Sequence, residues 1–307
     1  MIDKIFLFVL LISGSFLFAQ NKKINVKFST QKDNSVVFSY TKTIPGSYYL
    51  KVSFNKLNNS LNINNVFYKV LKNKSGYLFK LRPVNKSRGI SFSYSYFYIM
   101  GKPNPKIDTS FVYLLPFKEG KNIYFEPITK NVKEYFGAKP AENFYKYQFI
   151  SKNPDTVCAV RKGTVISVVD KYSVDTTLAY SYSSERNRIT IEHKDGTFAD
   201  YTGFHKDKIF VKTGDIVYPG TELGVLDRYD KSKQYQLRLG FFFLKKPKSN
   251  FKSEYKYFTP YFLTSNGVEK LQPEKNYTVK VSGEIVMKEM KRKEKKKWKK
   301  KHKKRKR

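Results

Sequence analysis

The residues of this sequence that could bind a metal or act as nucleophiles are few and scattered. Only three of the 307 residues are histidine, and only one, Cys158, is cysteine. A single cysteine excludes an intrachain disulfide framework and a cysteine-based zinc cluster. A catalytic zinc site needs three protein ligands with nitrogen, sulfur or carboxylate oxygen donors, and an open position for water. Zinc chemistry would therefore require the scattered histidines to combine with carboxylates.

The local context of these residues favours structural roles. His193 shares a strand face with Ile189 and Ile191, because side chains two residues apart on a strand point the same way. We therefore interpret His193 as a structural residue. Cys158 lies in a short apolar run, so we expect a buried and inert thiol. Three nearby carboxylates are expected to be solvated at turns or strand edges: Asp195, Asp200 and Asp207.

The chain is strongly basic, with 60 Lys and Arg against 25 Asp and Glu and a formal net charge of +35. Residues 288–307 alone carry 15 basic and two acidic side chains. A surface of this sign attracts polyanions, with an affinity that falls as salt rises. Because like charges repel, we expect the tail to be disordered, or helical only against a polyanion. It could anchor the chain to anionic lipid or polysaccharide; a solvated extension is the alternative.

Residues 1–19 have the pattern of a secretory signal, with Lys4 before an apolar run and the small residue Ala19 at the end. The run is shorter than the roughly 20 apolar residues that span a bilayer. We therefore expect export to the periplasm or cell envelope, or secretion, with an uncleaved anchor as the alternative. Export disfavours nucleic acid as a partner and favours acidic envelope polymers or lipids.

Short runs rich in Val, Ile, Tyr and Phe, broken by turn residues, predict an all-β protein. We predict an antiparallel β-sandwich over residues 20–130 and a linker over residues 131–144, which contain Gly137 and Pro140. The strands expected in the sandwich lie within residues 35–40, 47–54, 66–71, 77–81, 90–99 and 111–115.

Three later segments resemble the lysostaphin-type (LytM-type) zinc metallopeptidases, which cut peptide cross-links in bacterial peptidoglycan. They are DTVCA followed by GTV between residues 155 and 165, NRITIEHKDGTFADY at 187–201, and VKTGDIVYPGTELG at 211–224. Their order and spacing make the likeness specific. The resemblance implies a β barrel-sandwich-hybrid (duplicated hybrid motif) over residues 145–250, with a groove across one sheet. We expect a β appendage over residues 251–287 to follow it.

The positions at which this family carries its catalytic residues hold other residue types here. The family's zinc ligands correspond to Phe144, Gln148 and Arg238, the first of which has no donor atom. A Gln amide is a poor zinc ligand, and Arg is a permanent cation that repels a metal ion. The family's two other catalytic histidines correspond to Gln236 and Gly203. We therefore expect a degenerate domain with no zinc or other cofactor and no hydrolysis by the family mechanism.

The substituted positions define a candidate groove. Strand alternation puts Gln236 and Arg238 on one face, which in the family is turned toward the substrate, and Tyr201, Gly203 and His205 complete the candidate set. The Arg238 guanidinium could bind a carboxylate in a bidentate manner; a plain surface arginine is the alternative. His205 reaches the groove only if the alignment slips by two residues.

Degenerate LytM-type domains regulate peptidoglycan hydrolases. The resemblance therefore implies a non-catalytic envelope protein that binds peptidoglycan or regulates an envelope hydrolase. Two alternatives stay open. One is an active zinc metalloendopeptidase that acts on peptidoglycan cross-links. The other is a cationic adhesive or structural envelope protein.

Overall fold

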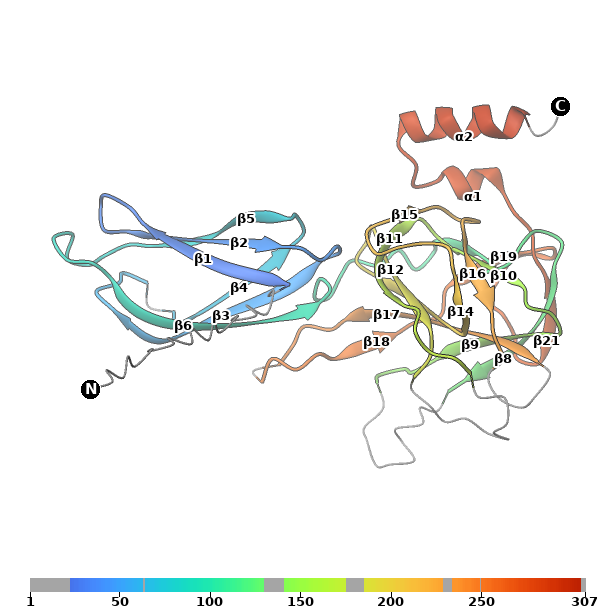
Figure 1. Ribbon diagram of the computed structural model, residues 1–307, viewed down its shortest axis with the longest axis horizontal. Helices are drawn as coiled ribbons and strands as arrows, with labels where there is room; N and C mark the ends of the chain where they lie inside the picture. The colour runs from blue at the N-terminus through green and yellow to red at the C-terminus, as the bar shows by residue number, and fades with distance from the viewer. Residues whose placement is uncertain are drawn as a thin grey trace, which may run out of the picture.

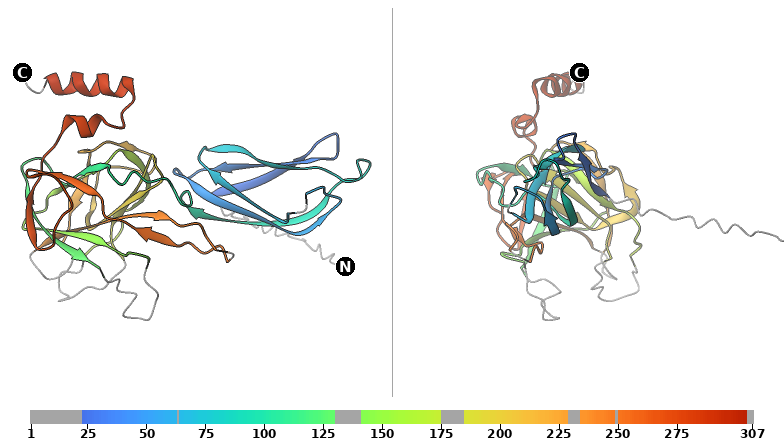
Figure 2. Two further views of the ribbon diagram at one scale, coloured as in Figure 1. Left: turned by 180° about the vertical axis from the view of Figure 1, so that it is seen from behind. Right: turned by 90° about the vertical axis from the view of Figure 1, so that its left-hand side faces the viewer.

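A computed structural model describes residues 23–62, 64–129, 141–174, 185–228, 234–248 and 250–304, with side chains described up to residue 300. The expected signal segment and most of the expected linker lie outside these residues. Two β-rich bodies follow one another along the long axis of the molecule, and two C-terminal helices pack on the second body (Figure 1). Figure 2 shows the same arrangement from behind and from one end. The predicted all-β class is confirmed.

The first body is a sandwich of two three-stranded antiparallel sheets, with the orders β1-β2-β5 and β4-β3-β6. Inward-facing side chains such as Phe38 and Leu50 are almost fully buried between the sheets, in line with the period-two alternation of strands. The strands are β1 (Ile24–Thr30), β2 (Val36–Lys42), β3 (Tyr48–Asn58), β4 (Val66–Leu71), β5 (Ser75–Leu81) and β6 (Ser91–Met100).

The second body is built on a nine-stranded sheet with the order β15-β11-β12-β13-β17-β9-β8-β21, in which β18 also pairs with β17. A three-stranded sheet, β10-β16-β14, contributes to the same core, and a third sheet has the order β20-β19-β7. The strands of the central part of the chain are β7 (Val112–Leu114), β8 (Asn122–Ile128), β9 (Lys146–Ser151), β10 (Thr156–Cys158), β11 (Gly163–Val169), β12 (Arg188–His193), β13 (Phe198–Thr202), β14 (Phe204–Ile209), β15 (Ile216–Val217) and β16 (Glu222–Leu226). The remaining strands are β17 (Tyr235–Leu244), β18 (Tyr255–Tyr257), β19 (Tyr261–Thr264), β20 (Gly267–Glu269) and β21 (Lys275–Thr278).

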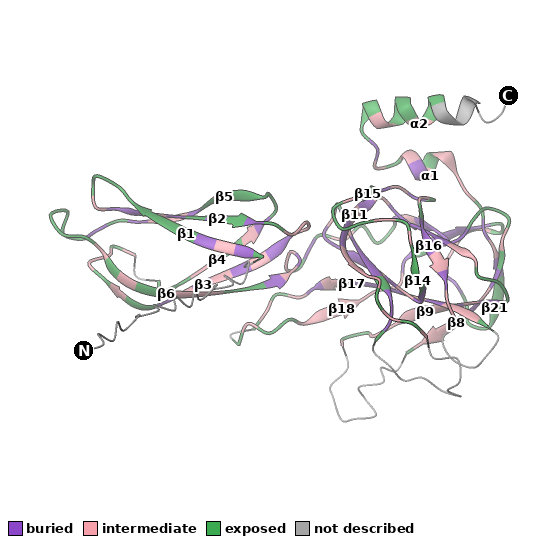
Figure 3. Ribbon diagram, viewed as in Figure 1, coloured by how far each residue is buried: buried purple, intermediate pink, exposed green. Residues whose placement is uncertain are grey.

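The core of the second body lies between the nine-stranded sheet and the smaller sheets. From β17, Leu237, Leu239 and Phe241 point into this core and are fully buried. Figure 3 colours the ribbon by burial and shows buried stretches along the strands of this body. Full burial of one such side chain stabilises a fold by roughly 1.5–3 kcal/mol. Because strand side chains alternate, Gln236 and Arg238 lie on the opposite face, which we call the outer face of the sheet.

The boundary between the two bodies differs from the sequence-based expectation. We expected residues 20–130 to form one unit, but β7 and β8 belong to the second body. β8 pairs with β9 and β21, and β7 pairs in parallel with β19. Apolar periodicity shows that a segment is a strand, but it does not show which sheet the strand joins. The expected 251–287 appendage is likewise part of the second body, because β18 and β21 extend its main sheet.

The two bodies meet at a joint that contains a partly buried carboxylate. Glu192 accepts hydrogen bonds from the Ser47 backbone N–H, at 2.7 Å, and from the Ser47 hydroxyl. Beside it, Phe198 and Phe242 pack with Met100 from the end of β6. Burial raises the pKa of Glu192 above its ordinary value, although the Ser47 hydrogen bonds oppose the shift.

The basic C-terminal segment is largely helical as far as the structure describes it, to residue 304, which corrects the expected disorder of that part of residues 288–307. Helix α1 spans Gly283–Met287 and α2 spans Arg292–Lys304. Val286 and Met290 are buried in a small cluster with Leu114 and Leu263, so packing on the second body holds the base of the segment. Among the described residues, no helix is long and apolar enough to cross a membrane.

Candidate functional site

The outer face of the nine-stranded sheet carries polar side chains in rows across neighbouring strands. In one row, Glu126, Gln148, Arg238 and Thr202 are register partners on β8, β9, β17 and β13. Register partners have Cβ atoms about 4.5–5.5 Å apart. Their side chains can therefore present a continuous polar strip to a ligand that lies across the strands.

Within this row, Gln148 bridges two charged side chains. The Arg238 Nε donates a hydrogen bond to Gln148 Oε1 at 3.3 Å. Gln148 Nε2 in turn donates to Glu126 Oε2 at 3.4 Å. Gln148 and Arg238, two positions that correspond to zinc ligands in the family, therefore lie directly opposite each other. The Gln148 Oε1 atom, which could otherwise face a metal cation, instead accepts a hydrogen bond from the Arg238 guanidinium.

The next row holds a partly buried ion pair. Lys146 Nζ lies 3.2 Å from Asp200 Oδ2, and the two side chains are 19% and 14% exposed. The Thr190 hydroxyl donates to the other Asp200 oxygen at 3.0 Å. Asp200 is therefore not the solvated carboxylate that we expected, because a cross-strand lysine covers and neutralises it.

A shallow hollow of about 690 Å³ opens on this face beside the Gln148 row. It lies over β8, β9, β17 and β21, and its walls include Glu126 and Tyr124. Its most frequent functional group is the side-chain amide, contributed by Asn122, Gln148, Asn153, Gln234, Gln236 and Asn276. Each amide offers both a donor and an acceptor, so the hollow can pair with groups that have the same two functions, such as peptide bonds.

The other predicted groove residues lie elsewhere. Tyr201 points into the core, is fully buried and accepts a hydrogen bond from the Val160 N–H at 3.0 Å. Its assignment to the groove was wrong, because Tyr201 shares its strand face with the core residue Ala199. Gly203 is buried in the turn between β13 and β14, with a φ of +120° that favours glycine.

His205 and Phe144 are also removed from the Gln148 row. His205 is exposed on β14, and its Nδ1 lies 2.6 Å from the Lys206 carbonyl oxygen. Phe144 precedes β9 and packs edge-on against Tyr257, with ring centroids 5.0 Å apart. Of the predicted set, the structure therefore brings together Gln148, Gln236 and Arg238 only.

The residues at the three corresponding ligand positions do not fit a zinc ion. Phe144 supplies no donor, and Arg238 places a permanent positive charge beside the only neutral acceptor, Gln148. Over the described residues, no group of three or more His, Cys, Asp and Glu side chains is placed to hold a metal. No chemical step through a metal can be derived for this face.

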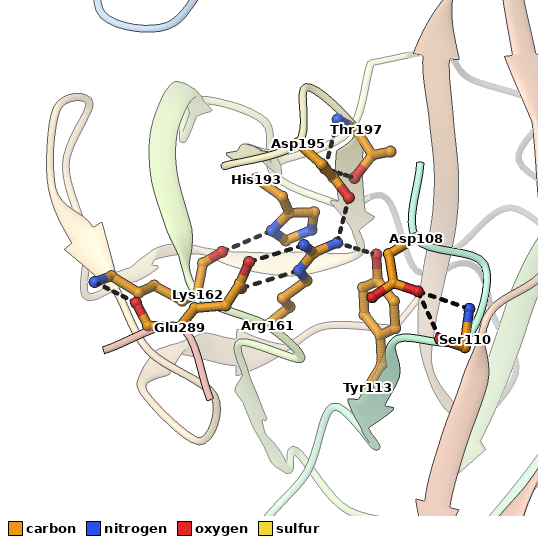
Figure 4. Close-up of polar contacts among 9 residues, drawn as sticks. All are labelled: Asp108, Ser110, Tyr113, Arg161, Lys162, His193, Asp195, Thr197 and Glu289. Atoms are coloured by element: carbon orange, nitrogen blue, oxygen red, sulfur yellow. Dashed lines mark hydrogen bonds and ion pairs between the residues drawn. The ribbon is translucent and has the colours of Figure 1, made fainter. Parts of the chain in front are cut away.

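A second polar cluster, which the sequence did not predict, surrounds the buried Arg161 (Figure 4). Its guanidinium donates to Tyr113 and to Asp195 at 2.8 Å each, and to the two Glu289 oxygens at 3.0 and 2.8 Å. It also stacks on Phe111, with the guanidinium carbon 3.8 Å from the ring centroid. Arg161 is only 3% exposed, so this cluster is structural and closed to solvent.

The Arg161 cluster explains several perturbed groups. Burial by itself would lower the pKa of Arg161, but its hydrogen bonds to Glu289 and the charge of Asp195 raise it above its ordinary value. Burial raises the pKa of Tyr113 to about 12. Asp195, expected to be solvated, is 12% exposed and ion-paired with Arg161. Sequence reasoning missed this pair because its members are 34 residues apart.

The predictions for His193 and Cys158 are confirmed as regards burial. His193 is 2% exposed, its Nδ1 lies 2.9 Å from the Lys162 carbonyl oxygen, and its Nε2 has no hydrogen-bond partner. Burial and then the positive charge of Arg161 lower the pKa of His193 to about 3. Burial likewise raises the pKa of the Cys158 thiol to about 12, so neither residue is available as a base or nucleophile at neutral pH.

Comparison with known proteins adds little to these observations. No family model and no curated protein matches the sequence. Among solved structures, the chain is similar to Csd3 of Helicobacter pylori, with 10% sequence identity and a TM-score of 0.29 over 82% of this chain and 72% of that chain. A likeness at this level leaves the family of the chain open, and its function rests on its own residues.

Proposed function

We propose that the chain is a non-catalytic protein of the cell envelope whose second body binds peptidoglycan on the outer face of the nine-stranded sheet. The observation that carries the proposal is the gathering of six side-chain amides in one hollow. Peptidoglycan presents peptide bonds along its stems and N-acetyl groups along its glycan strands. Amide side chains complement both, because each pairs a donor with an acceptor.

The charged groups beside the hollow support the same ligand class. Arg238 lies one row from Gln236 on the same face and contacts Gln148. A peptide stem ends in a carboxylate, which a guanidinium binds more strongly and more directionally than a neutral donor does. The export of the chain is part of this proposal and follows from the pattern of residues 1–19.

Binding of soluble muropeptides, measured by calorimetry, tests the proposal. The variant Gln236→Ala with Arg238→Ala should bind at least about tenfold more weakly, because a hydrogen bond to a charged group contributes about 1.5–3 kcal/mol. Arg88→Ala is a matched control, since Arg88 is exposed on the first body. Unchanged binding in the double variant, or no binding by the natural chain, would refute the proposal.

Two measurements on the same preparation distinguish the competing function, an active zinc metalloendopeptidase, from non-catalytic binding. Elemental analysis should give far less than one zinc per chain, and cross-linked muropeptides should stay intact. Stoichiometric zinc, with cleavage abolished by a chelator, would replace the binding function by peptidase activity.

A further inference from the structure

The helix α2 presents a uniformly cationic surface to solvent. Seven basic side chains are exposed along its first nine residues: Arg292, Lys293, Lys295, Lys296, Lys297, Lys299 and Lys300. None of them forms an ion pair with another described residue. At 100° and 1.5 Å per residue they cover an arc of roughly 200° of the helix, along a length of about 13 Å.

Among residues 292–300 of α2, only Glu294 and Trp298 are not exposed; they lie four positions apart and face the second body. Glu294 Oε2 lies 2.7 Å from Lys162 Nζ, and the Tyr218 hydroxyl donates to its other oxygen at 2.7 Å. Trp298 packs over Gly283, where an added Cβ would meet the ring at 3.1 Å. The one acidic and the one aromatic side chain of the helix therefore hold it in place.

Docking and charge repulsion act in opposite directions on this helix. Lysines four residues apart, such as Lys295 and Lys299 or Lys296 and Lys300, destabilise an isolated helix. The contacts of Glu294 and Trp298 offset this repulsion and fix which side of α2 faces outward. Because these contacts already order the segment, binding to an anionic surface carries no further ordering cost. Such a surface would also relieve the repulsion between the lysines.

The position of α2 limits the shape of its partner. In all three views α2 is the outermost element at its end of the molecule, with α1 and the sheets beneath it (Figures 1 and 2). A flat surface can therefore lie along α2 without meeting the rest of the chain that the structure describes. No apolar residue lies on the exposed arc, which argues for attachment to the surface of a bilayer rather than insertion into it.

We propose that α2 is a pre-ordered docking surface for an anionic phospholipid membrane. It binds lipid headgroups through its exposed lysines and arginine, while Trp298 stays turned toward the protein. This surface is separate from the amide-lined hollow, so it attaches the chain to a membrane independently of any peptidoglycan bound by the sheet. Each basic residue near an anionic surface strengthens binding by about fivefold.

Sedimentation with phospholipid vesicles tests this proposal on the full chain. Vesicles with about one third phosphatidylglycerol should bind the chain, phosphatidylcholine vesicles should not, and salt of about 0.5 M should release it. The quadruple variant Lys295→Gln, Lys296→Gln, Lys299→Gln and Lys300→Gln should bind at least about tenfold more weakly. A control with the same charge change on the first body, Lys32→Gln, Lys56→Gln, Lys74→Gln and Lys86→Gln, should lose less than about twofold. Equal losses in both variants would overturn the proposal.

Two further arms decide the kind of partner and the orientation of the helix. Trp298 is the only tryptophan in the chain, so its fluorescence reports on α2 alone. Vesicles that carry a quencher in their acyl chains should leave this fluorescence unchanged on binding; strong quenching would show that α2 turns over and inserts.

Binding of soluble polyphosphate through α2 without binding of anionic vesicles would also overturn the proposal, in favour of a polymer. The variant Gln236→Ala with Arg238→Ala should bind vesicles normally, so a failure of membrane binding can be told apart from a failure of peptidoglycan binding.

Discussion

Arg161 and Glu289 form a two-pronged ion pair that joins the C-terminal segment to the second body, with N···O distances of 3.0 and 2.8 Å. Both side chains are almost inaccessible to solvent, at 3% and 13% exposed. The pair connects a residue just before β11 to one between α1 and α2. It therefore fixes the base from which the cationic helix projects.

Removal of the carboxylate from this pair should be costly. Glu289→Ala leaves the buried Arg161 with one of its two carboxylates missing, and breaking a buried pair in this way typically costs about 3–5 kcal/mol. Urea unfolding measures the loss. Glu222→Ala is the matched control, because Glu222 and its partner Lys118 are 52% and 61% exposed and surface pairs contribute little. Similar losses from the two variants would show that Arg161 does not depend on Glu289.

Acid should destabilise the fold through His193. Its pKa falls from an ordinary 6.5 to about 3 in the folded chain, because burial and then Arg161 disfavour the charged ring. Between these values the unfolded chain binds a proton that the folded chain does not, so stability falls as the pH decreases, by at most about 1.4 kcal/mol per pH unit. Above pH 6.5 this contribution is fully present.

The variant His193→Asn isolates this effect, because Asn can keep a donor toward the Lys162 carbonyl but does not titrate. Urea unfolding of both proteins between about pH 7 and about pH 4 should show that the stability advantage of the natural chain shrinks as the pH falls. Glu192 and the other carboxylates are present in both chains, so their titration cancels in the comparison. A difference that stays constant over this range would contradict the assigned pKa shift.

Several strands could be predicted from the sequence because they alternate strictly and end at turn residues. Residues 66–71 are predicted with the bounds that β4 has in the structure, and the hairpin around Asp195 and Gly196 joins β12 to β13. Alternation along β17 also gives the correct outward face for Gln236 and Arg238. These features depend on local chemistry, which a single sequence contains.

Features that depend on distant partners could not be predicted. β8 joins the second body through β9 and β21, and nothing within its own residues indicates that choice. Asp195 looks like a solvated turn residue until the fold brings Arg161 beside it. One local signal favoured an ordered helix at α2, because Glu294 and Trp298 are spaced to share a helix face. The high positive charge of the segment favoured disorder more strongly, so the prediction followed the charge.

The Cys158 thiol should not react in the folded chain. It is 2% exposed, and burial raises its pKa to about 12, so very little nucleophilic thiolate exists at neutral pH. Labelling with a disulfide reagent should be at least about a hundredfold slower in buffer than in concentrated urea. Rapid labelling of the folded chain would mean that β10 opens locally without global unfolding.

Two glycines that look alike in the sequence should respond differently to an added methyl group. At Gly163, the first residue of β11, a Cβ would lie 2.7 Å from the Glu192 carbonyl oxygen and closer still to the Ile191 side chain. The neighbouring strand β12 cannot move away without losing its pairing with β11, so Gly163→Ala should destabilise the chain by about 1–3 kcal/mol or more. At Gly89 a Cβ meets no atom within 4 Å, and Gly89→Ala should change stability by less than about 0.5 kcal/mol. Thermal unfolding of the two variants measures the contrast. Equal melting temperatures would mean that β11 and β12 do not approach each other as closely as the structure shows. The sheet beside the Arg161 cluster would then have room for an added methyl group.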